Sequence, residues 1–325
     1  MGLNDQPFSL LPTGNSVPLW SEAFRTYLQI AFQNKGISPS PGNYSFIRRH
    51  LDNQLFTNPT YQVIHLRSAQ LTPNTFKFDL ANTYCDVIDL SPKGWSISPD
   101  FDTRFYCPEA SWALPRPVRT TTKLHECLQQ SLGLSQTNSK DLSNWLVQAL
   151  LGQNPPALII TGNASQAATK QLRMMLDPVS NAILEIPQTA MQLAQLAVTN
   201  KVLAFSIYEQ ITPNKIEAIN KIRTGTEVVI KDVSKFRPAV RETLQRPVML
   251  SAKVAPKIHE GQLEIEINEA KDSVFSKLFA ALLTAAVRSI QVIPVRSAPI
   301  DYPRDISDLD YSPLTPHTED EGPAP

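Results

Sequence analysis

The stretch 155–169 constrains the fold of this chain more than any other, because it combines a buried strand, a tight turn and the start of a helix. It reads Pro-Pro-Ala-Leu-Ile-Ile-Thr-Gly-Asn-Ala-Ser-Gln-Ala-Ala-Thr. The apolar run 157–160 predicts a buried parallel strand, which ends at Gly162. The segment from Ala167 to Leu176 has the composition of a helix. A strand, a short loop and a helix in this order predict an α/β fold.

The loop fits the frame of a phosphate-binding P-loop, G-x-x-x-x-G-K-[ST], in which backbone N–H groups and a lysine hold phosphates. Gly162 takes the first glycine position and Thr169 takes the last position. Ala167 replaces the second glycine and Ala168 replaces the lysine, so the charge that binds the β- and γ-phosphates is missing. Lys170 points about 200° round the helix from position 168 and is a poor substitute. An ordinary βα turn is the alternative interpretation of this loop taken alone.

Four further segments follow the loop in a recognisable order. They are Leu176-Asp177-Pro178, Val202-Leu203-Ala204-Phe205, Thr224-Gly225 and Arg246-Pro247-Val248-Met249-Leu250. In order and spacing, this set resembles a family of bacterial and phage P-loop ATPases that are related to primase–helicases and are often carried by mobile elements. The resemblance implies a P-loop NTPase core of the AAA+ or helicase-like kind, with parallel strands between helices.

The residues that depart from this family's pattern stand at the positions that carry catalysis in the family. Ser206 stands where the family has the Walker B aspartate that organises Mg²⁺, and Ser251 stands at the polar sensor position. A hydroxyl cannot replace a carboxylate in holding a hard divalent cation and its activated water. With Ala168 at the lysine position as well, the resemblance implies a pseudo-ATPase that is not an enzyme and uses no cofactor.

The pattern along the chain predicts four parts. A flexible lead over 1–17 is followed by a helical and β-rich module over 18–120, because two helical patterns precede short alternating strands between Tyr61 and Val118. The degenerate P-loop ATPase-like domain covers 121–295. Residues 301–325 hold seven acidic residues and one arginine, so 296–325 is predicted to be a disordered, acidic and Pro-rich tail.

The region 215–257 is strongly basic, with ten Lys and Arg residues against four Asp and Glu residues. In helicase-like ATPases this interval can carry a hairpin whose basic residues touch the nucleic-acid backbone, and Thr226–Val233 alternates well enough to be one of its strands. The candidates for backbone contacts are Lys231, Lys235, Arg237 and Arg241. A solvated basic surface without a ligand is the alternative interpretation.

Composition restricts the setting. Basic and acidic residues balance at 30 each, and the three cysteines show neither metal spacing nor a disulfide framework, which indicates a reducing compartment. Met1–Val17 lacks a basic region followed by an apolar one, and the most apolar stretch, Leu278–Val287, is too short to cross a bilayer. We therefore predict a cytoplasmic protein that does not contact membranes.

Three functional hypotheses follow. The first is a catalytically inactive, helicase-like ATPase homologue that binds nucleic acid or acts as a scaffold in a mobile-element or phage-related complex. The second is a protein–protein interaction subunit that partners an active ATPase, in which the basic segment meets an acidic partner instead of nucleic acid. A protein partner or self-association is expected. The third is an unorthodox ATP-binding enzyme that uses Lys170 and an acid from a partner.

Overall fold

The structure is a computed structural model of the 325-residue chain. It describes residues 8–11, 16–19, 21–57, 63–82, 84–106, 108, 111–180, 182–208, 210–230, 240–259, 261–271 and 275–292, with the backbone alone at 55, 56, 226–230, 240–243, 291 and 292. The chain divides into Met1–Ile293 and Pro294–Pro325, and the predicted acidic tail lies outside the described residues. Within the described part the fold is mixed α/β, with eight helices and both parallel and antiparallel sheets.

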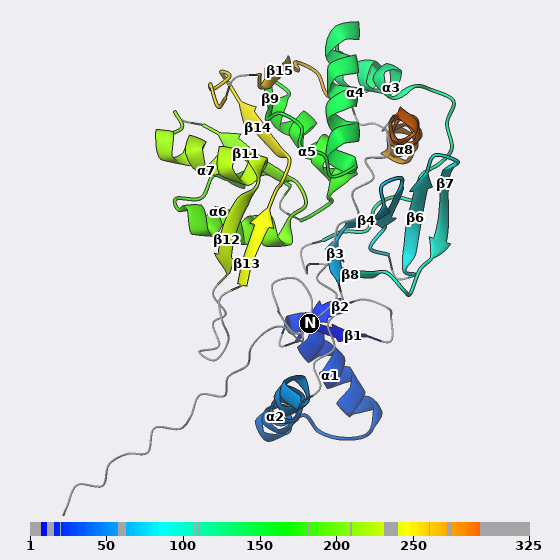
Figure 1. Cartoon of the computed structure of the whole chain (residues 1–325), viewed down its shortest axis with the longest axis vertical. Helices are drawn as coiled ribbons and strands as arrows, with labels where there is room; N and C mark the ends of the chain where they lie inside the picture. The colour runs from blue at the N-terminus through cyan, green and yellow to red at the C-terminus, as the bar shows by residue number, and fades with distance from the viewer. Residues whose placement is uncertain are drawn as a thin grey trace, which may run out of the picture. The chain divides into compact units, whose positions relative to one another are not determined.

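The centre of the fold is a five-stranded sheet in which every pairing is parallel. Its strands lie in the order β10-β11-β14-β9-β15 (Figure 1). In chain order these are β9 (Leu158–Thr161), β10 (Leu184–Glu185), β11 (Leu203–Ile207), β14 (Val248–Ala252) and β15 (Leu263–Glu266). Strands β9, β11 and β14 are mostly apolar because helices cover both faces of this part of the sheet.

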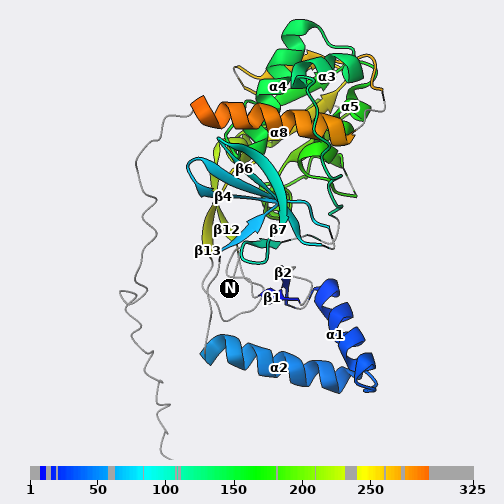
Figure 2. The ribbon, with the colours of Figure 1, turned by 90° about the vertical axis from the view of Figure 1, so that its right-hand side faces the viewer.

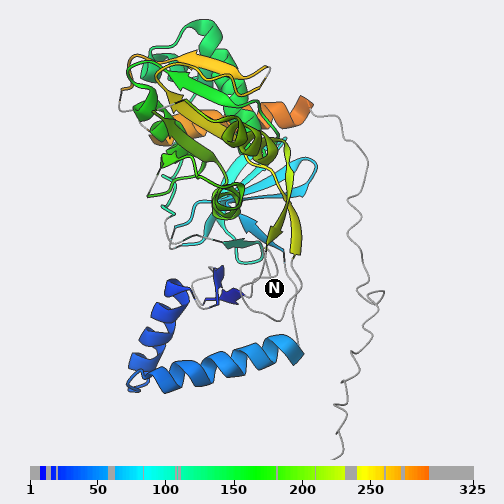
Figure 3. The ribbon, with the colours of Figure 1, turned by 90° about the vertical axis from the view of Figure 1, so that its left-hand side faces the viewer.

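Each face of the sheet packs into its own apolar core, since successive residues of a strand point to opposite faces. In β9, Leu158 and Ile160 pack with α4, α5 and α8, whereas Ile159 packs with α6 and α7. Figure 3 views the sheet from the side of α6 and α7. The helices are α4 (Gln136–Leu150), α5 (Ser165–Leu176), α6 (Ala190–Thr199), α7 (Pro213–Thr224) and α8 (Phe275–Val292).

An antiparallel sheet shares the core on the α8 side. It is formed by β4 (Ser68–Thr72), β5 (Thr75–Asp79), β6 (Asp86–Ser91) and β7 (Gly94–Pro99). Figure 2 shows α8 lying lengthwise between this sheet and the helices α4 and α3 (Leu124–Leu132). Phe78 and Leu90 of the antiparallel sheet belong to the same buried cluster as Leu282 of α8. The β-rich module and the parallel sheet therefore form one continuous core.

A second small sheet includes two strands from the N-terminal part of the chain, where the sequence predicted a flexible lead. Its strands β1 (Phe8–Leu10), β2 (Ser16–Pro18), β8 (Arg104–Tyr106) and β3 (Ile64–Leu66) lie in that order. The predicted flexible lead over 1–17 therefore contains strand residues, which is a correction for 8–10 and 16–17. The aromatic ring of Phe8 packs edge-on against Tyr106 at 5.4 Å, and Val17 is buried. These contacts come from a strand about 90 residues away, so the local sequence did not indicate them.

The other elements agree closely with the sequence pattern. Helices α1 (Glu22–Asn34) and α2 (Pro41–Thr57) occupy the two predicted helical segments, with proline tolerated at the start of α2. Strands β12 (Thr226–Ile230) and β13 (Val240–Leu244) pair antiparallel, as the predicted hairpin requires. Among the helices that the structure describes, none has the length and apolar character needed to cross a membrane.

Candidate functional site

The loop after β9 is held tightly against the segment that follows β15. Gly162 has a φ of +92°, and a Cβ at this position would lie 2.5 Å from the Ile267 carbonyl oxygen and 2.7 Å from Asn268 Oδ1. A side chain is excluded both by the backbone conformation and by this close approach. Glycine is thus required at the first position of the predicted P-loop frame. The reason is the close packing of two segments of the chain, and a phosphate plays no part in it.

The N–H groups of this loop already have acceptors within the chain. The N–H of Asn163 donates to Asn268 Oδ1 at 3.2 Å, and the N–H of Ala164 donates to the Ile267 carbonyl at 3.0 Å. Asn268 is held in place by its own Nδ2, which donates to Glu266 Oε1 at 3.0 Å. In a phosphate-binding loop, such N–H groups point at the ligand. Here the chain itself occupies them.

Helix α5 begins at Ser165, two residues before the predicted start at Ala167. The shorter loop changes where the following residues lie. Ala168, at the lysine position, is fully buried in the core, while Ala167 and Lys170 are exposed. Thr169 is also buried, and its hydroxyl donates to the Ser165 carbonyl at 2.8 Å within the helix. The position that would carry the catalytic lysine therefore faces the interior of the protein.

Two serines at the carboxyl ends of neighbouring strands meet the start of α5. Ser206 of β11 and Ser251 of β14 are direct cross-strand partners. The buried Ser251 hydroxyl donates to Ser165 Oγ at 3.2 Å, and Gln166 Nε2 donates to Ser206 Oγ at 3.1 Å. The same amide donates to the hydroxyl of the exposed Tyr208 at 3.0 Å. The structure thus brings Gly162, Ser206 and Ser251 to one edge of the sheet.

The cluster of Ser165, Gln166, Ser206, Tyr208 and Ser251 consists of hydroxyls and an amide. A carboxylate of this edge, Glu266, is hydrogen-bonded to Asn268. Within the described ranges, no group of three His, Cys, Asp or Glu residues is placed to hold a metal ion. The sequence did not single out Gln166, Tyr208 or Asn268. Gln166 lies at a variable position of the motif, and Asn268 reaches the loop only through the pairing of β15 with β9.

The predicted nucleic-acid contacts cannot be placed in the same detail. Lys231, Lys235 and Arg237 lie outside the described residues, and Arg241 is described only through its backbone in β13.

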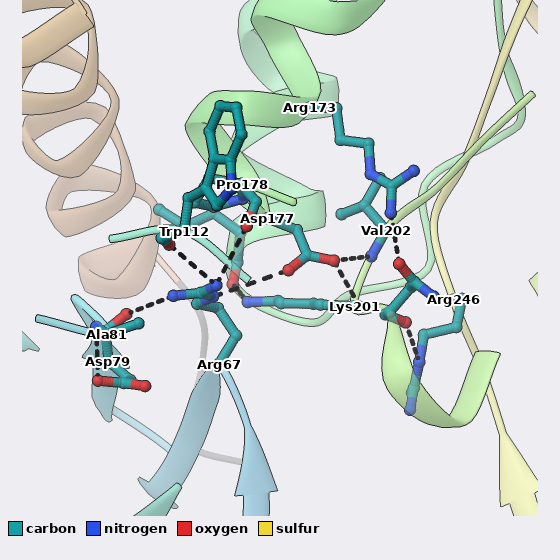
Figure 4. Close-up of polar contacts among 12 residues, drawn as sticks. Arg67, Asp79, Ala81, Trp112, Arg173, Asp177, Pro178, Lys201, Val202 and Arg246 are labelled. Carbon is teal, nitrogen blue, oxygen red and sulfur yellow. Dashed lines mark hydrogen bonds and ion pairs between the residues drawn. The ribbon is translucent and has the colours of Figure 1, made fainter. Parts of the chain in front are cut away.

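The opposite edge of the parallel sheet holds a buried network of charged side chains (Figure 4). Asp177, at the end of α5, accepts hydrogen bonds through Oδ2 from the N–H groups of Lys201 and Val202, at 2.7 and 3.2 Å. Its other oxygen lies 3.7 Å from Nε of Arg67, and both side chains of this ion pair are 3% exposed. The carboxylate therefore joins α5, the start of β11 and the antiparallel sheet.

Arg67 connects three segments through carbonyl groups. Its guanidinium donates to the carbonyl oxygens of Asp79, Trp112 and Pro178, each at 3.4 Å. These acceptors come from β5, from the segment before α3 and from the turn after α5. Because a buried guanidinium needs both a counter-charge and acceptors, its removal should affect all three segments at once.

Lys201 is a buried ionisable group of this network with a strongly lowered pKa. Burial lowers the pKa of its ammonium group to about 7, although the neighbouring Asp177 carboxylate acts in the opposite direction. Its Nζ donates to the Leu150 carbonyl at 2.9 Å and lies 4.9 Å from the centre of the Phe78 ring. The group faces the core and has no access to solvent, so we interpret it as structural.

Arg246 extends the network to the start of β14. Its Nε donates to the carbonyls of Ala197 and Asn200, at 2.7 and 3.0 Å, and thereby closes the end of α6. Arg173 of α5 donates to Asn200 Oδ1 at 2.6 Å. Asp177 and Arg246 are residues of the motifs that match the ATPase family. These matching residues lie at the amino ends of the strands, away from the loop.

Comparison with known proteins gives little further guidance. No family model and no curated protein matches this chain. Two apo structures of the NrS-1 C-terminal region are distantly similar. The first is 8% identical with a TM-score of 0.34, and covers 65% of this chain and 64% of that chain. The second is 8% identical with a TM-score of 0.32, and covers 62% and 63%. The match spans slightly less than two thirds of either chain, and a TM-score this low does not establish a common fold.

Proposed function

We propose that this chain is a catalytically inactive, helicase-like homologue of P-loop ATPases that acts as a nucleic-acid-binding or scaffolding subunit, in a mobile-element or phage-related complex. The observation that carries the inactive part is the loop after β9. Its N–H groups at Asn163 and Ala164 are bonded to Asn268 and Ile267. A phosphate can bind these groups only after both contacts are broken, and each broken contact leaves a polar group that needs a new partner.

The placement of the strands supports the same proposal. Open α/β sheets bind ligands outside the carboxyl ends of their strands, at the point where the strand order reverses. Strand β14 lies between β9 and β11, so the loop, Ser251 and Ser206 share that edge. None of them supplies the charge that Mg²⁺ and a γ-phosphate require. We therefore expect neither metal-dependent nucleotide binding nor hydrolysis.

Isothermal titration calorimetry with Mg–ATP at concentrations up to the millimolar range tests this part directly. We expect no saturable heat, and no phosphate release above the buffer rate in a parallel turnover assay. Saturable binding would support the unorthodox ATP-binding enzyme instead. Turnover that disappears when Lys170 is replaced by Ala would establish that alternative.

The binding role is supported by charge. The segment 215–257 has a net charge of +6, and its hairpin β12–β13 has the antiparallel pairing expected of a nucleic-acid-binding arm. Backbone binding by such a segment should be independent of sequence and should weaken steeply with salt, because bound cations displace condensed counterions.

Fluorescence anisotropy with labelled single- and double-stranded oligonucleotides over a salt series measures this. We expect the chain to bind the oligonucleotides with micromolar affinity at low salt, and ATP should not change this affinity. Charge reversal at Lys231, Lys235, Arg237 and Arg241 should weaken it at least ten-fold. Absence of binding at low salt would reject nucleic acid as the ligand.

Exposed apolar residues favour a second candidate, the protein–protein interaction subunit. Ile30 of α1, Ile37 in the following turn and Phe46 of α2 are 51%, 43% and 73% exposed. All three belong to the segment of α1 and α2, and apolar surface exposed there is available for contact with another protein. Light scattering after gel filtration tests self-association. A monomer that retains no active ATPase partner in a pull-down would exclude this candidate.

A further inference from the structure

Two hollows lie on either side of the C-terminal half of α8, on the face of the molecule formed by α3, α4, α8 and β7. The first has a volume of about 420 Å³, and its lining includes Lys93, Trp95, Arg119, Thr120, Thr284 and Val287. The second has a volume of about 300 Å³, and its lining includes Lys123, His125, Lys140, Ser143, Asn144 and Arg288. Helix α8 and the chain 119–125 contribute to both, so the two hollows are neighbouring parts of one surface, which we call the α8 groove.

The α8 groove is basic. The linings of the two hollows together hold five Lys and Arg residues, Lys93, Arg119, Lys123, Lys140 and Arg288, and one carboxylate, Asp89. In the described part of the chain, none of Arg119, Lys123, Lys140 and Arg288 is within ion-pair distance of a carboxylate. By contrast, Lys77 of the neighbouring sheet is paired with Asp100 at 2.5 Å. The groove therefore presents exposed positive charges that the protein does not neutralise.

The shape of the groove is fixed by rigid elements. Trp95 Nε1 donates to Thr284 Oγ1 at 3.3 Å, which fastens β7 to α8. The guanidinium of Arg119 lies 5.5 Å from the centre of the Trp95 ring, where the π-electron face attracts a cation. Arg288 and Lys140 project from helices whose opposite faces belong to the buried core. A ligand would meet a preformed arrangement of charges.

The chemistry of the lining favours a sugar–phosphate backbone. The linings also carry hydroxyl and amide groups from Thr120, Asn144 and Ser289, which are common donors to phosphate and sugar oxygens. The hydroxyl of Ser143, by contrast, donates to the Ser139 carbonyl at 2.6 Å. The apolar side chains of the linings are partly or fully buried, with Trp95 and Val287 partly exposed in the first hollow and Leu124 and Val147 buried in the second. A peptide would need apolar anchors to bind here with useful affinity, whereas a phosphodiester chain needs only spaced positive charge.

The α8 groove lies away from the predicted basic hairpin. Helix α8 packs on the face of the parallel sheet that carries Leu158 and Ile160, whereas β12 and β13 contact α7 and α6 on the other face. We propose that the α8 groove binds single-stranded nucleic acid through its phosphates, as a second basic surface besides the hairpin; this rests on the proposed nucleic-acid-binding function. Two neighbouring hollows lined by separated cations suit a single strand, which can bend from one to the other, better than a stiff duplex.

The test is fluorescence anisotropy of the full chain with a labelled single-stranded oligonucleotide over a salt series. The double variant Lys140→Glu/Arg288→Glu should weaken binding about ten-fold or more at low salt. It should also reduce the slope of log K against log salt by about 1.4, at about 0.7 per phosphate contact for a single strand. Lys35→Glu, at the exposed end of α1, is the matched control and should change neither quantity.

Three outcomes would overturn the inference, and they can be told apart. If the wild-type chain binds and the double variant binds equally well, the groove is not the site, while the proposed function stands. If the wild-type chain binds no oligonucleotide at low salt, both fail. If a duplex, or an acidic peptide such as poly-glutamate, displaces the strand as effectively as unlabelled single strand, the groove recognises negative charge without regard to a single-stranded backbone. Thermal unfolding of the double variant confirms that it is folded.

Discussion

The two edges of the parallel sheet differ in the charged side chains that they carry. At the carboxyl edge, the positions that matter for phosphate and metal chemistry hold Ala168, Ser206 and Ser251. At the amino edge, Asp177 and Arg246 are buried or partly buried and hold strands and helices together through charged hydrogen bonds. Asp177 and Arg246 are structural residues, whereas the predicted nucleotide positions Ala168, Ser206 and Ser251 carry no charge.

The difference has a physical basis. A buried carboxylate such as Asp177 satisfies two N–H groups and a guanidinium, so losing it leaves several buried groups without partners. A catalytic lysine has no such role, since its partner is the ligand. Replacing it with alanine, as at Ala168, allows the helix to pack directly on the core. Four experiments test this comparison, from the largest expected effect to the smallest.

Asp177→Ala should destabilise the protein by about 3–5 kcal/mol, because it leaves buried Arg67 without its counter-charge and two N–H groups without an acceptor. Urea unfolding monitored by fluorescence measures the change. Asp177→Asn keeps an acceptor and should lose less. Glu217→Gln, in an exposed pair with Lys221, is the control and should have no measurable effect. A loss below about 1 kcal/mol for Asp177→Ala would mean that the network does not stabilise the fold.

Ala168→Lys should fail to restore a P-loop. The side chain at 168 is fully buried, so a lysine would place an unpaired charge in the core and cost roughly 3 kcal/mol or more. Calorimetry should still detect no ATP binding. Lys170→Ala, on the exposed side of α5, is the matched control and should be close to neutral. Recovery of nucleotide binding by Ala168→Lys would show that the loop can open and would contradict the inactive assignment.

Stability should rise with pH above about 7 because of Lys201. Its pKa in the folded protein is lowered to about 7 from the usual 10.5, so between these values the unfolded chain binds a proton that the folded chain does not. The free energy of unfolding should then increase by about 1.4 kcal/mol per pH unit. Lys201→Met should remove this slope. Equal pH dependence of the wild type and Lys201→Met would show that the ammonium group is not desolvated.

Gly162→Ala should destabilise the loop by about 1–3 kcal/mol, since it adds backbone strain to a clash with the Ile267 carbonyl. Gly261→Ala provides a close comparison, because Gly261 also has a positive φ of +77° but has open space around it. The difference between the two variants measures the close packing of the loop against the segment after β15. Equal losses would indicate that only the backbone conformation matters.

Much of the fold follows from local pattern. The strand β9 and the helix α5 that follows it are predicted within two residues, because both depend on the period and composition of short segments. The strands at 8–10 and 16–18 were not predicted, because strands of only three residues depend on a partner elsewhere in the chain. The early start of α5 at Ser165 was missed for a similar reason, since the contact with Ile267 decides the length of the loop.

The sequence by itself determined which chemical groups this protein lacks, since no folding can supply a carboxylate at Ser206 or an ammonium group at Ala168. Only the tertiary structure decided which groups of the chain lie beside the loop and the serines instead. Asn163 and Asn268 are 105 positions apart, and Arg67 and Pro178 are 111 apart. Local propensity cannot predict such contacts. They form because the packed core brings these segments together, and because buried polar groups must then find partners within the chain.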